Sequence, residues 1–262
     1  MRYVIIGAGA VGGTIGGLLA EAGREVVLVA RGAHLDAVRD EGLHLTTPAG
    51  ARVVRAATAA GPEDVDLRPG DVLVLAVKGQ DTAATTAQWA GRPVVGGRTA
   101  GEDLLLVCAQ NGVDNERTAL RRFARVVGMC VWLPATFLEP GRVSAAGSPV
   151  TGVLTMGSYP VGEPDADLAA VRADLEAVGF RAPVVRDVMA WKYAKLLSNL
   201  GNAVEALCGP VREPAAKELL SATVAEAREV LAAAGVEPTS PEEEADARGD
   251  FTLVELDRKS VV

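Results

Sequence analysis

The sequence predicts an α/β fold, in which an N-terminal doubly wound Rossmann-type sheet is followed by a smaller all-helical domain. Three observations predict it. A short apolar run at the N-terminus enters a glycine-rich turn, strand and helix patterns then alternate, and from residue 187 onward only helix patterns remain. We therefore expect an NADP-binding domain over residues 1–186 and a shortened helical domain for substrate and catalysis over residues 187–262.

The first element is a strand over residues 3–6 that leads through a G-x-G-x-x-G turn into an amphipathic helix. Gly7 permits the tight turn, Gly9 lets the backbone approach a pyrophosphate, and Gly12 lets the helix pack closely on the strand. The diphosphate would rest on free N–H groups at the helix N-terminus. The cofactor-binding residues predicted in this turn are Gly7, Ala8, Gly9, Ala10, Val11 and Gly12.

The second strand, over residues 25–29, indicates which dinucleotide is bound. NAD-binding folds carry an acidic residue near this point, which bonds the ribose 2′-hydroxyl. Here Ala30 and Arg31 stand there instead, and a guanidinium can bond a 2′-phosphate through two parallel hydrogen bonds. The sequence therefore predicts NADP(H). The alternative is that Arg31 is only a solvated loop cation.

The remaining elements follow from apolar runs, helix-forming composition and turn residues. We expect a short antiparallel pair over 43–45 and 51–54, buried strands over 71–77 and 104–108, helices over 81–90 and 165–178, a short strand over 183–185, and an acidic loop over 238–249.

Polar residues directly follow two of the buried strands, where ligands of open α/β sheets lie. Lys78 follows the strand that begins at Asp71, and it can reach a cofactor phosphate or a substrate carboxylate. Asn111 follows the next buried strand, and it offers both a donor and an acceptor to the nicotinamide ribose or the substrate. Ordinary turn chemistry is the alternative explanation for each.

A long helix is predicted over residues 188–208, with Asp187 as its N-cap and Gly209-Pro210 at its end. One side is rich in leucine and is expected to be buried as far as Leu207. The other side carries a line of polar groups, which we expect to face the interdomain cleft, although a solvated face is the common explanation of such a line. Its members are Lys192, Lys195, Asn199 and Asn202.

The chemistry of ketone reduction singles out one member of that line. Hydride delivery from NADPH leaves negative charge on the ketone oxygen, which a positioned ammonium can stabilise and protonate. With no Tyr-x-x-x-Lys pair and no suitable histidine, Lys195 is the best available acid, and its ordinary pKa of about 10.4 keeps it protonated at neutral pH. Asn199 and Asn202 can bind substrate hydroxyl or carbonyl groups.

Composition limits the class of protein. The chain has 262 residues, 49% of them hydrophobic, and a formal charge of −8, which argues against a nucleic-acid-binding face. It contains no membrane-length apolar run, no room for a signal peptide, and no cluster of residues that suggests a metal site. We expect a cytoplasmic protein whose oligomeric state stays open, a homodimer included, and whose cysteines are reduced core thiols: Cys108, Cys130 and Cys208.

Taken together, these segments resemble the ketopantoate reductase (2-dehydropantoate 2-reductase) family, of the 6-phosphogluconate dehydrogenase-like superfamily. The resemblance implies reduction of 2-dehydropantoate to (R)-pantoate with NADPH, a step towards pantothenate and coenzyme A. It implies cofactor-phosphate contacts for Arg31 and Lys78, cofactor and substrate contacts for Asn111, catalysis by Lys195, and substrate binding by Asn199 and Asn202. The matching segments are GAGAVGG at 7–13, Arg31, VKGQ at 77–80, QNG at 110–112 and WKYAKLLSNLGNAVEAL at 191–207.

The resemblance covers roughly residues 1–250 and then fails, so we expect a truncated or altered C-terminus. The family pattern S-S…E-x-D-x-x-N-G is not matched, and no role is placed on Glu255 or Ser260. Two alternatives therefore stay open beside ketopantoate reduction. One is a protein that binds NADP with little or no catalysis, and the other is a reductase of a different branched 2-keto acid.

Overall fold

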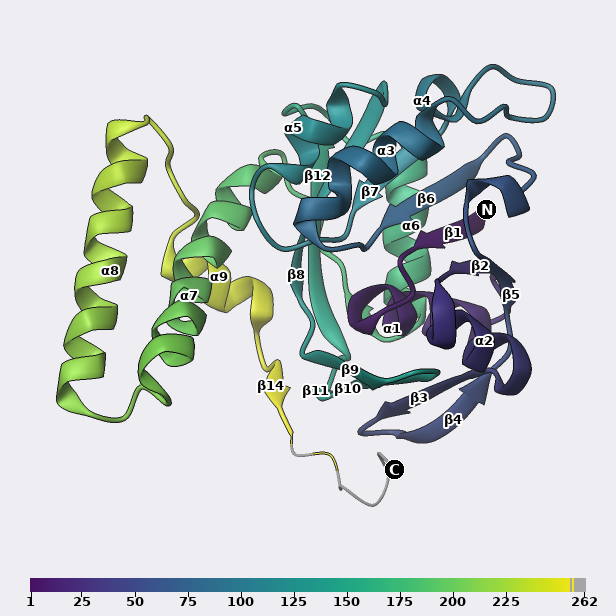
Figure 1. Cartoon of the computed structure of the whole chain (residues 1–262). Helices are drawn as coiled ribbons and strands as arrows, with labels where there is room; N and C mark the ends of the chain where they lie inside the picture. The colour runs from purple at the N-terminus through teal and green to yellow at the C-terminus, as the bar shows by residue number, and fades with distance from the viewer. Residues whose placement is uncertain (255, 257–262) are drawn as a thin grey trace.

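The computed structural model describes residues 1–254 and residue 256, so Glu255 and Ser260 lie outside the described residues (Figure 1). The main sheet has the strand order β13-β12-β8-β7-β6-β1-β2-β5. Its strands are β1 (Arg2–Ile6), β2 (Glu25–Val29), β5 (Ala57–Ala59), β6 (Asp71–Leu75), β7 (Leu105–Cys108), β8 (Arg125–Trp132), β12 (Gly152–Tyr159) and β13 (Phe180–Arg181).

Neighbouring strands run parallel from β5 across to β8, and β12 then runs antiparallel to β8. This arrangement confirms the predicted α/β class with a Rossmann-type sheet. A second sheet has the order β4-β3-β10-β9, in which β3 and β4 form the predicted antiparallel pair. Its strands are β3 (Leu43–Thr47), β4 (Gly50–Val54), β9 (Ala135–Glu139) and β10 (Arg142–Ala145), and a third, small sheet pairs β11 (Gly147–Ser148) with β14 (Thr252–Leu253).

Helices cover both faces of the main sheet (Figure 1). Because successive side chains of a strand point to opposite faces, Tyr3 and Ile5 of β1 join one apolar core, while Val4 and Ile6 join the other. The first core contains side chains of α1 (Ala10–Glu21), α2 (Gly32–Glu41) and α6 (Ala166–Ala177). The second core contains side chains of α3 (Thr82–Ala90), α4 (Ala100–Asp103) and α5 (Asn115–Leu120).

The helical C-terminal part begins with α7 (Val188–Cys208), followed by α8 (Pro214–Ala233) and α9 (Pro241–Arg248). Asp187 caps α7 as predicted, because its carboxylate accepts the backbone N–H groups of Met189 and Ala190 at 3.0 and 3.3 Å. The helix ends at Gly209, whose φ of +75° suits glycine. The division of the chain at residue 186 stays a prediction.

Several local predictions were wrong. Residues 183–185 form only an isolated bridge at Val184, and the short strand lies earlier, in β13. The acidic segment expected as a loop over 238–249 contains α9, and the chain after it returns to strand as β14. Ser240 explains the helix, since it forms a capping box with Glu243 ahead of the first turn.

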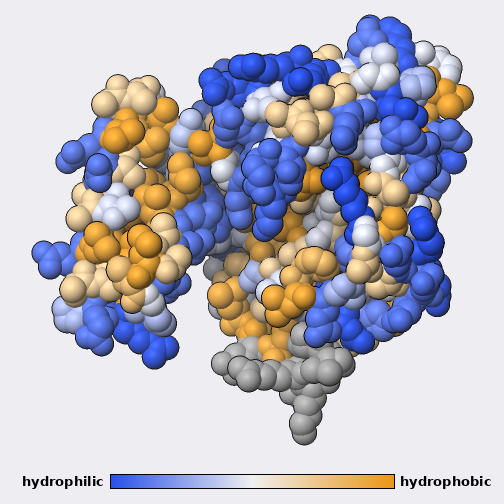
Figure 2. Space-filling model, viewed as in Figure 1, coloured by the Kyte–Doolittle hydropathy of each residue, from blue (hydrophilic) through white to orange (hydrophobic). Residues whose placement is uncertain are grey.

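The far end of α7 does not reach the sheet, so the leucine-rich side is not buried along its whole length. Leu197 and Val204 are buried, but Leu207 is 85% exposed and Cys208 is exposed rather than a core thiol. Figure 1 shows α7 and α8 as a hairpin that projects away from the main sheet, and apolar side chains are visible on it in Figure 2. Within the described part of the chain, no helix is both long and apolar enough to cross a bilayer.

Candidate active site

The glycine-rich turn joins β1 to α1, where each glycine has a distinct steric reason. Gly7 has a φ of +101°, which other residues rarely adopt. A Cβ on Gly12 would lie 2.2 Å from the carbonyl oxygen of Gly7, so only glycine fits there. A Cβ on Gly9 would meet nothing within 4 Å, because this residue borders open space. No side chain caps α1, so its first N–H groups are available to a ligand.

Replacing Gly12 with alanine is expected to lower the free energy of unfolding by roughly 1–3 kcal/mol, because the added methyl group would overlap backbone atoms. Urea denaturation measures the change. Gly9→Ala is the matched control, since its methyl group meets no protein atom, and it is expected to keep the wild-type midpoint while weakening cofactor binding. Equal midpoints for all three proteins would contradict the close packing described for Gly12.

A cavity of about 720 Å³ lies along this turn, at the carboxyl ends of β1, β2, β6 and β7. It lies where the order of a parallel sheet reverses between β1 and β6, as expected for ligand sites in such sheets. Arg31 lines it at the end of β2, and Lys78 lines it after β6. Eight of the nine cofactor-binding residues predicted from the sequence line this one cavity: Gly7, Ala8, Gly9, Ala10, Val11, Arg31, Lys78 and Asn111. The ninth, Gly12, is buried between α1 and β1 and does not line it.

His34 has a structural role in this cavity that the sequence did not reveal. Its Nδ1 accepts the N–H of Gly141 at 2.9 Å, so Nε2 carries the proton and donates to the carbonyl oxygen of Ala8 at 2.7 Å. Its ring also meets Phe137 edge to face, with 4.5 Å between ring centroids. The histidine therefore connects the glycine turn to the loop before β10.

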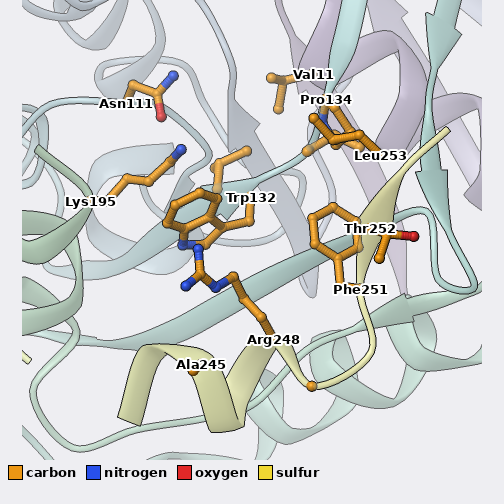
Figure 3. Close-up of a pocket in the computed structure, with 13 residues that line it drawn as sticks. Val11, Asn111, Trp132, Pro134, Lys195, Ala245, Arg248, Phe251, Thr252 and Leu253 are labelled. Carbon is orange, nitrogen blue, oxygen red and sulfur yellow. The ribbon is translucent and has the colours of Figure 1, made fainter. Parts of the chain in front are cut away.

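A second cavity, of about 660 Å³, adjoins the first. Val11 and Asn111 line both cavities, so they mark the boundary at which a ligand of one would meet a ligand of the other. Figure 3 shows Lys195 of α7 directed into this space between Asn111 and the indole of Trp132. The far wall comes from α9 and the chain after it, through Ala245, Arg248, Gly249, Phe251, Thr252 and Leu253.

Lys195 is a half-buried cation in contact with an aromatic ring. Its Nζ lies 3.5 Å from the ring centroid of Trp132, a distance typical of a cation–π contact. Burial lowers the pKa of Lys195 below 10.5, and the positive charge of Arg248 acts in the same direction, while Cys130 and Glu244 oppose the change. The ammonium is therefore a stronger acid than a free lysine.

Lys192, one turn earlier on α7, is not available to a ligand. Its side chain is 2% exposed and forms a buried ion pair with Glu116, whose side chain is 0% exposed. The ammonium also donates to the backbone oxygen of Gln110 at 3.0 Å. Burial raises the pKa of Glu116, and the charge of Lys192 opposes that rise.

A chain of hydrogen bonds extends this ion pair towards both cavities. The amide of Gln110 donates to Val77 O at 2.8 Å and to Thr82 Oγ1 at 2.9 Å. Thr82 in turn donates to the side chain of Asn115, which donates to the backbone oxygen of Asn111 at 2.9 Å. Lys192 therefore attaches α7 to the loops that carry the predicted cofactor-binding residues.

The predicted line of polar residues on α7 does not share one environment. Lys192 is buried and Lys195 lines the second cavity, whereas Asn199 is half-buried and Asn202 is exposed. Neither asparagine lines either of the cavities described above. Their role in substrate binding stays a prediction that this geometry does not support.

Sequence reasoning missed Trp132, Arg248 and Phe251, which line the second cavity. The helix that carries Arg248 could have been predicted, because Ser240-Pro241 followed by Glu243 is typical of a helix start. Nothing local could place Trp132 against Lys195, because that contact joins β8 to α7 across the fold. Among the described residues, no group of three His, Cys, Asp or Glu side chains could hold a metal ion.

Comparisons with known proteins agree with the fold and identify the family. The family model described as ketopantoate reductase PanE/ApbA matches residues 3–160. A 2-dehydropantoate 2-reductase from Archaeoglobus fulgidus is 32% identical over 243 residues, which cover 90% of this chain and 76% of that protein. One from Pyrococcus horikoshii is 29% identical over 218 residues, covering 81% of this chain and 67% of that protein. The crystal structure of a PanE/ApbA family ketopantoate reductase from Ralstonia eutropha JMP134 has a TM-score of 0.79 at 27% identity, covering 95% of this chain and 80% of that one.

Proposed function

The chain belongs to the ketopantoate reductase PanE/ApbA family, which makes it an oxidoreductase, and we propose that it reduces 2-dehydropantoate to (R)-pantoate with NADPH. The observation that carries the proposal is the meeting of two cavities at Val11 and Asn111. One cavity follows a dinucleotide-type turn, and the other contains the ammonium of Lys195. This arrangement suits hydride transfer between a nucleotide and a small carbonyl compound.

The residues present fit a nicotinamide dinucleotide. Gly9 leaves open space where a diphosphate would approach, and the uncapped N-terminus of α1 offers N–H groups to it. Arg31 is exposed at the edge of the same cavity, after a strand that ends without an acidic residue. A guanidinium there favours a 2′-phosphate, so NADP(H) is the preferred cofactor. Lys78 supplies a second positive charge to the cofactor phosphates.

Lys195 acts as the general acid. When bound, the reduced nicotinamide supplies the hydride that the keto carbon accepts. Lys195 then donates its proton to the keto oxygen, so the keto group becomes a hydroxyl group, the carboxylate of the substrate is unchanged and the lysine is left as a free amine. The lowered pKa of Lys195 makes this donation easier, and its ammonium stabilises the negative charge that develops on the oxygen.

Oxidation of NADPH, followed at saturating cofactor with a panel of 2-keto acids, tests the proposal. We expect 2-dehydropantoate to give the highest kcat/KM. Faster turnover of another branched 2-keto acid would identify a related reductase of different specificity. NADPH binding by calorimetry without turnover of any 2-keto acid would indicate a nucleotide-binding protein and contradict the proposed reaction.

Arg31→Ala is expected to raise the KM for NADPH by roughly 10-fold or more while changing that for NADH little, because only NADPH carries the 2′-phosphate. Steady-state kinetics with each cofactor measure the split. Arg39→Ala is the matched control, since Arg39 is an exposed arginine on α2 that does not line the cavity. An equal rise in KM for NADPH and NADH would contradict the proposed contact between Arg31 and the 2′-phosphate.

A further inference from the structure

The second cavity is lined by two positively charged side chains and by no acidic one. The two are Lys195 and Arg248. Among the described residues, no carboxylate lies within 4.0 Å of either cation. Its remaining polar side chains are neutral, namely Asn111, Thr252 and the indole of Trp132. Because two cations line this cavity without forming an ion pair with a described carboxylate, its charge favours an anionic ligand.

One aromatic ring brings the two cations together. The Nζ of Lys195 lies 3.5 Å from the ring centroid of Trp132, and the guanidinium carbon of Arg248 lies 4.5 Å from the same centroid. Figure 3 shows Lys195 approaching the indole from α7, while Arg248 approaches it from the end of α9. Both cations therefore lie beside the same wall of this cavity, on the two sides of the indole in Figure 3.

A 2-keto acid carries two neighbouring oxygen functions that need different partners. Reduction of its ketone requires a proton donor, and its carboxylate is bound most strongly by a cation that donates to both oxygens. Arginine suits the carboxylate, since it stays charged and its planar donors match the two oxygens. Resting on the proposed function, we propose that Arg248 binds the substrate carboxylate while Lys195 protonates the adjacent ketone.

The end of α9 is fixed in a way that suits this role. Arg181 of β13 donates to the backbone oxygens of Ala247 and Arg248, and it donates to the Asp250 carboxylate at 2.9 Å. These bonds hold the backbone of Arg248, while its guanidinium stays free of ion pairs with described carboxylates. Glu244, one turn earlier on α9, is a buried carboxylate whose charge acts on both Lys195 and Arg248, but it does not line the cavity.

Arg248→Gln, assayed with 2-dehydropantoate and with its neutral amide, tests the proposal. We expect kcat/KM for the acid to fall roughly 100-fold, while kcat/KM for the amide changes less than about threefold. Arg248→Lys should recover part of the lost activity with the acid, because it keeps the charge without the planar fork. Arg228→Gln on exposed α8 is the matched control and should leave both substrates unaffected. Equal losses for acid and amide, or no loss for either, would overturn the assignment.

A binding measurement separates this inference from the proposed reaction. Oxamate, an unreactive 2-keto acid analogue, is titrated by calorimetry into NADP⁺-saturated wild type and Arg248→Gln. We expect the variant to bind oxamate roughly 100-fold more weakly. Equal affinities overturn the role of Arg248 even where turnover is normal. Weaker binding by the variant supports that role even where the wild type reduces no 2-keto acid.

Discussion

Lys195→Ala is expected to lower kcat for keto-acid reduction by roughly 10²–10⁴-fold, because the variant loses both the proton donor and the charge opposite the developing alkoxide. Binding of NADPH should stay nearly intact, since Lys195 lines the second cavity and not the dinucleotide cavity. Steady-state kinetics and calorimetry measure the two effects. Lys217→Ala, an exposed lysine on α8, is the control. A Lys195 variant with undiminished kcat would refute the proposed acid.

The pH profile gives an independent readout of the same group. The acid must be protonated to donate, so kcat for reduction should fall as the pH rises through the pKa of Lys195. Burial and the charge of Arg248 lower that pKa below the ordinary value of 10.5, and the loss should therefore begin at a lower pH than for a free lysine. A reduction rate that does not fall with rising pH would argue against lysine as the donor.

Lys192→Met is expected to destabilise the protein by about 3–5 kcal/mol, because it leaves the Glu116 carboxylate buried without its partner. Lys192→Met combined with Glu116→Gln removes both charges and should recover much of the loss. Urea denaturation at fixed pH compares the three proteins. A double variant as unstable as the single one would show that packing, not charge, explains the effect.

The free energy of unfolding of the Lys192→Met variant should also depend on pH, in a direction that follows from the pKa of Glu116. Without Lys192, burial raises the pKa of Glu116 above its value of about 4.3 in the unfolded chain. The folded state then binds more protons than the unfolded state, so stability decreases as the pH rises from about 4 towards 7. Unfolding free energies measured across that range should therefore decline for the variant more steeply than for the double variant.

The sequence predicted best those features that depend on residues close together along the chain. The strand, glycine turn and helix at the N-terminus are local, and Arg31, Lys78 and Asn111 follow directly from the ends of buried strands. Spacing along α7 was less informative, because helical position gives the face of a helix and not what covers it. Lys192 and Lys195 share a face by spacing, yet one is paired inside the fold and the other lines a cavity.

The wall of the second cavity could not be predicted, because it depends on contacts between distant parts of the chain. Arg248 reaches Trp132 only through the placement of α9 beside β13 and through the pairing of β14 with β11. The predicted burial of Leu207 was wrong for a related reason. An apolar residue at helical spacing is buried only where a neighbouring element lies, and the end of α7 extends beyond the sheet.

The limited attachment of α9 and β14 has a consequence for the local unfolding of this part of the molecule. Residues 245–253 are attached to the main body by the bonds of Arg181, by the contact of Arg248 with Trp132, by the bond from Thr252 to the Ser148 carbonyl oxygen and by the short β11–β14 ladder. So small an attachment can detach without global unfolding, and its backbone amides should exchange with solvent deuterium far sooner than those of β1 or β6. An anion bound by both Arg248 and Lys195 would add a link between residues 245–253 and α7. Amide exchange in this segment should therefore become slower as the cavity is filled by the anion.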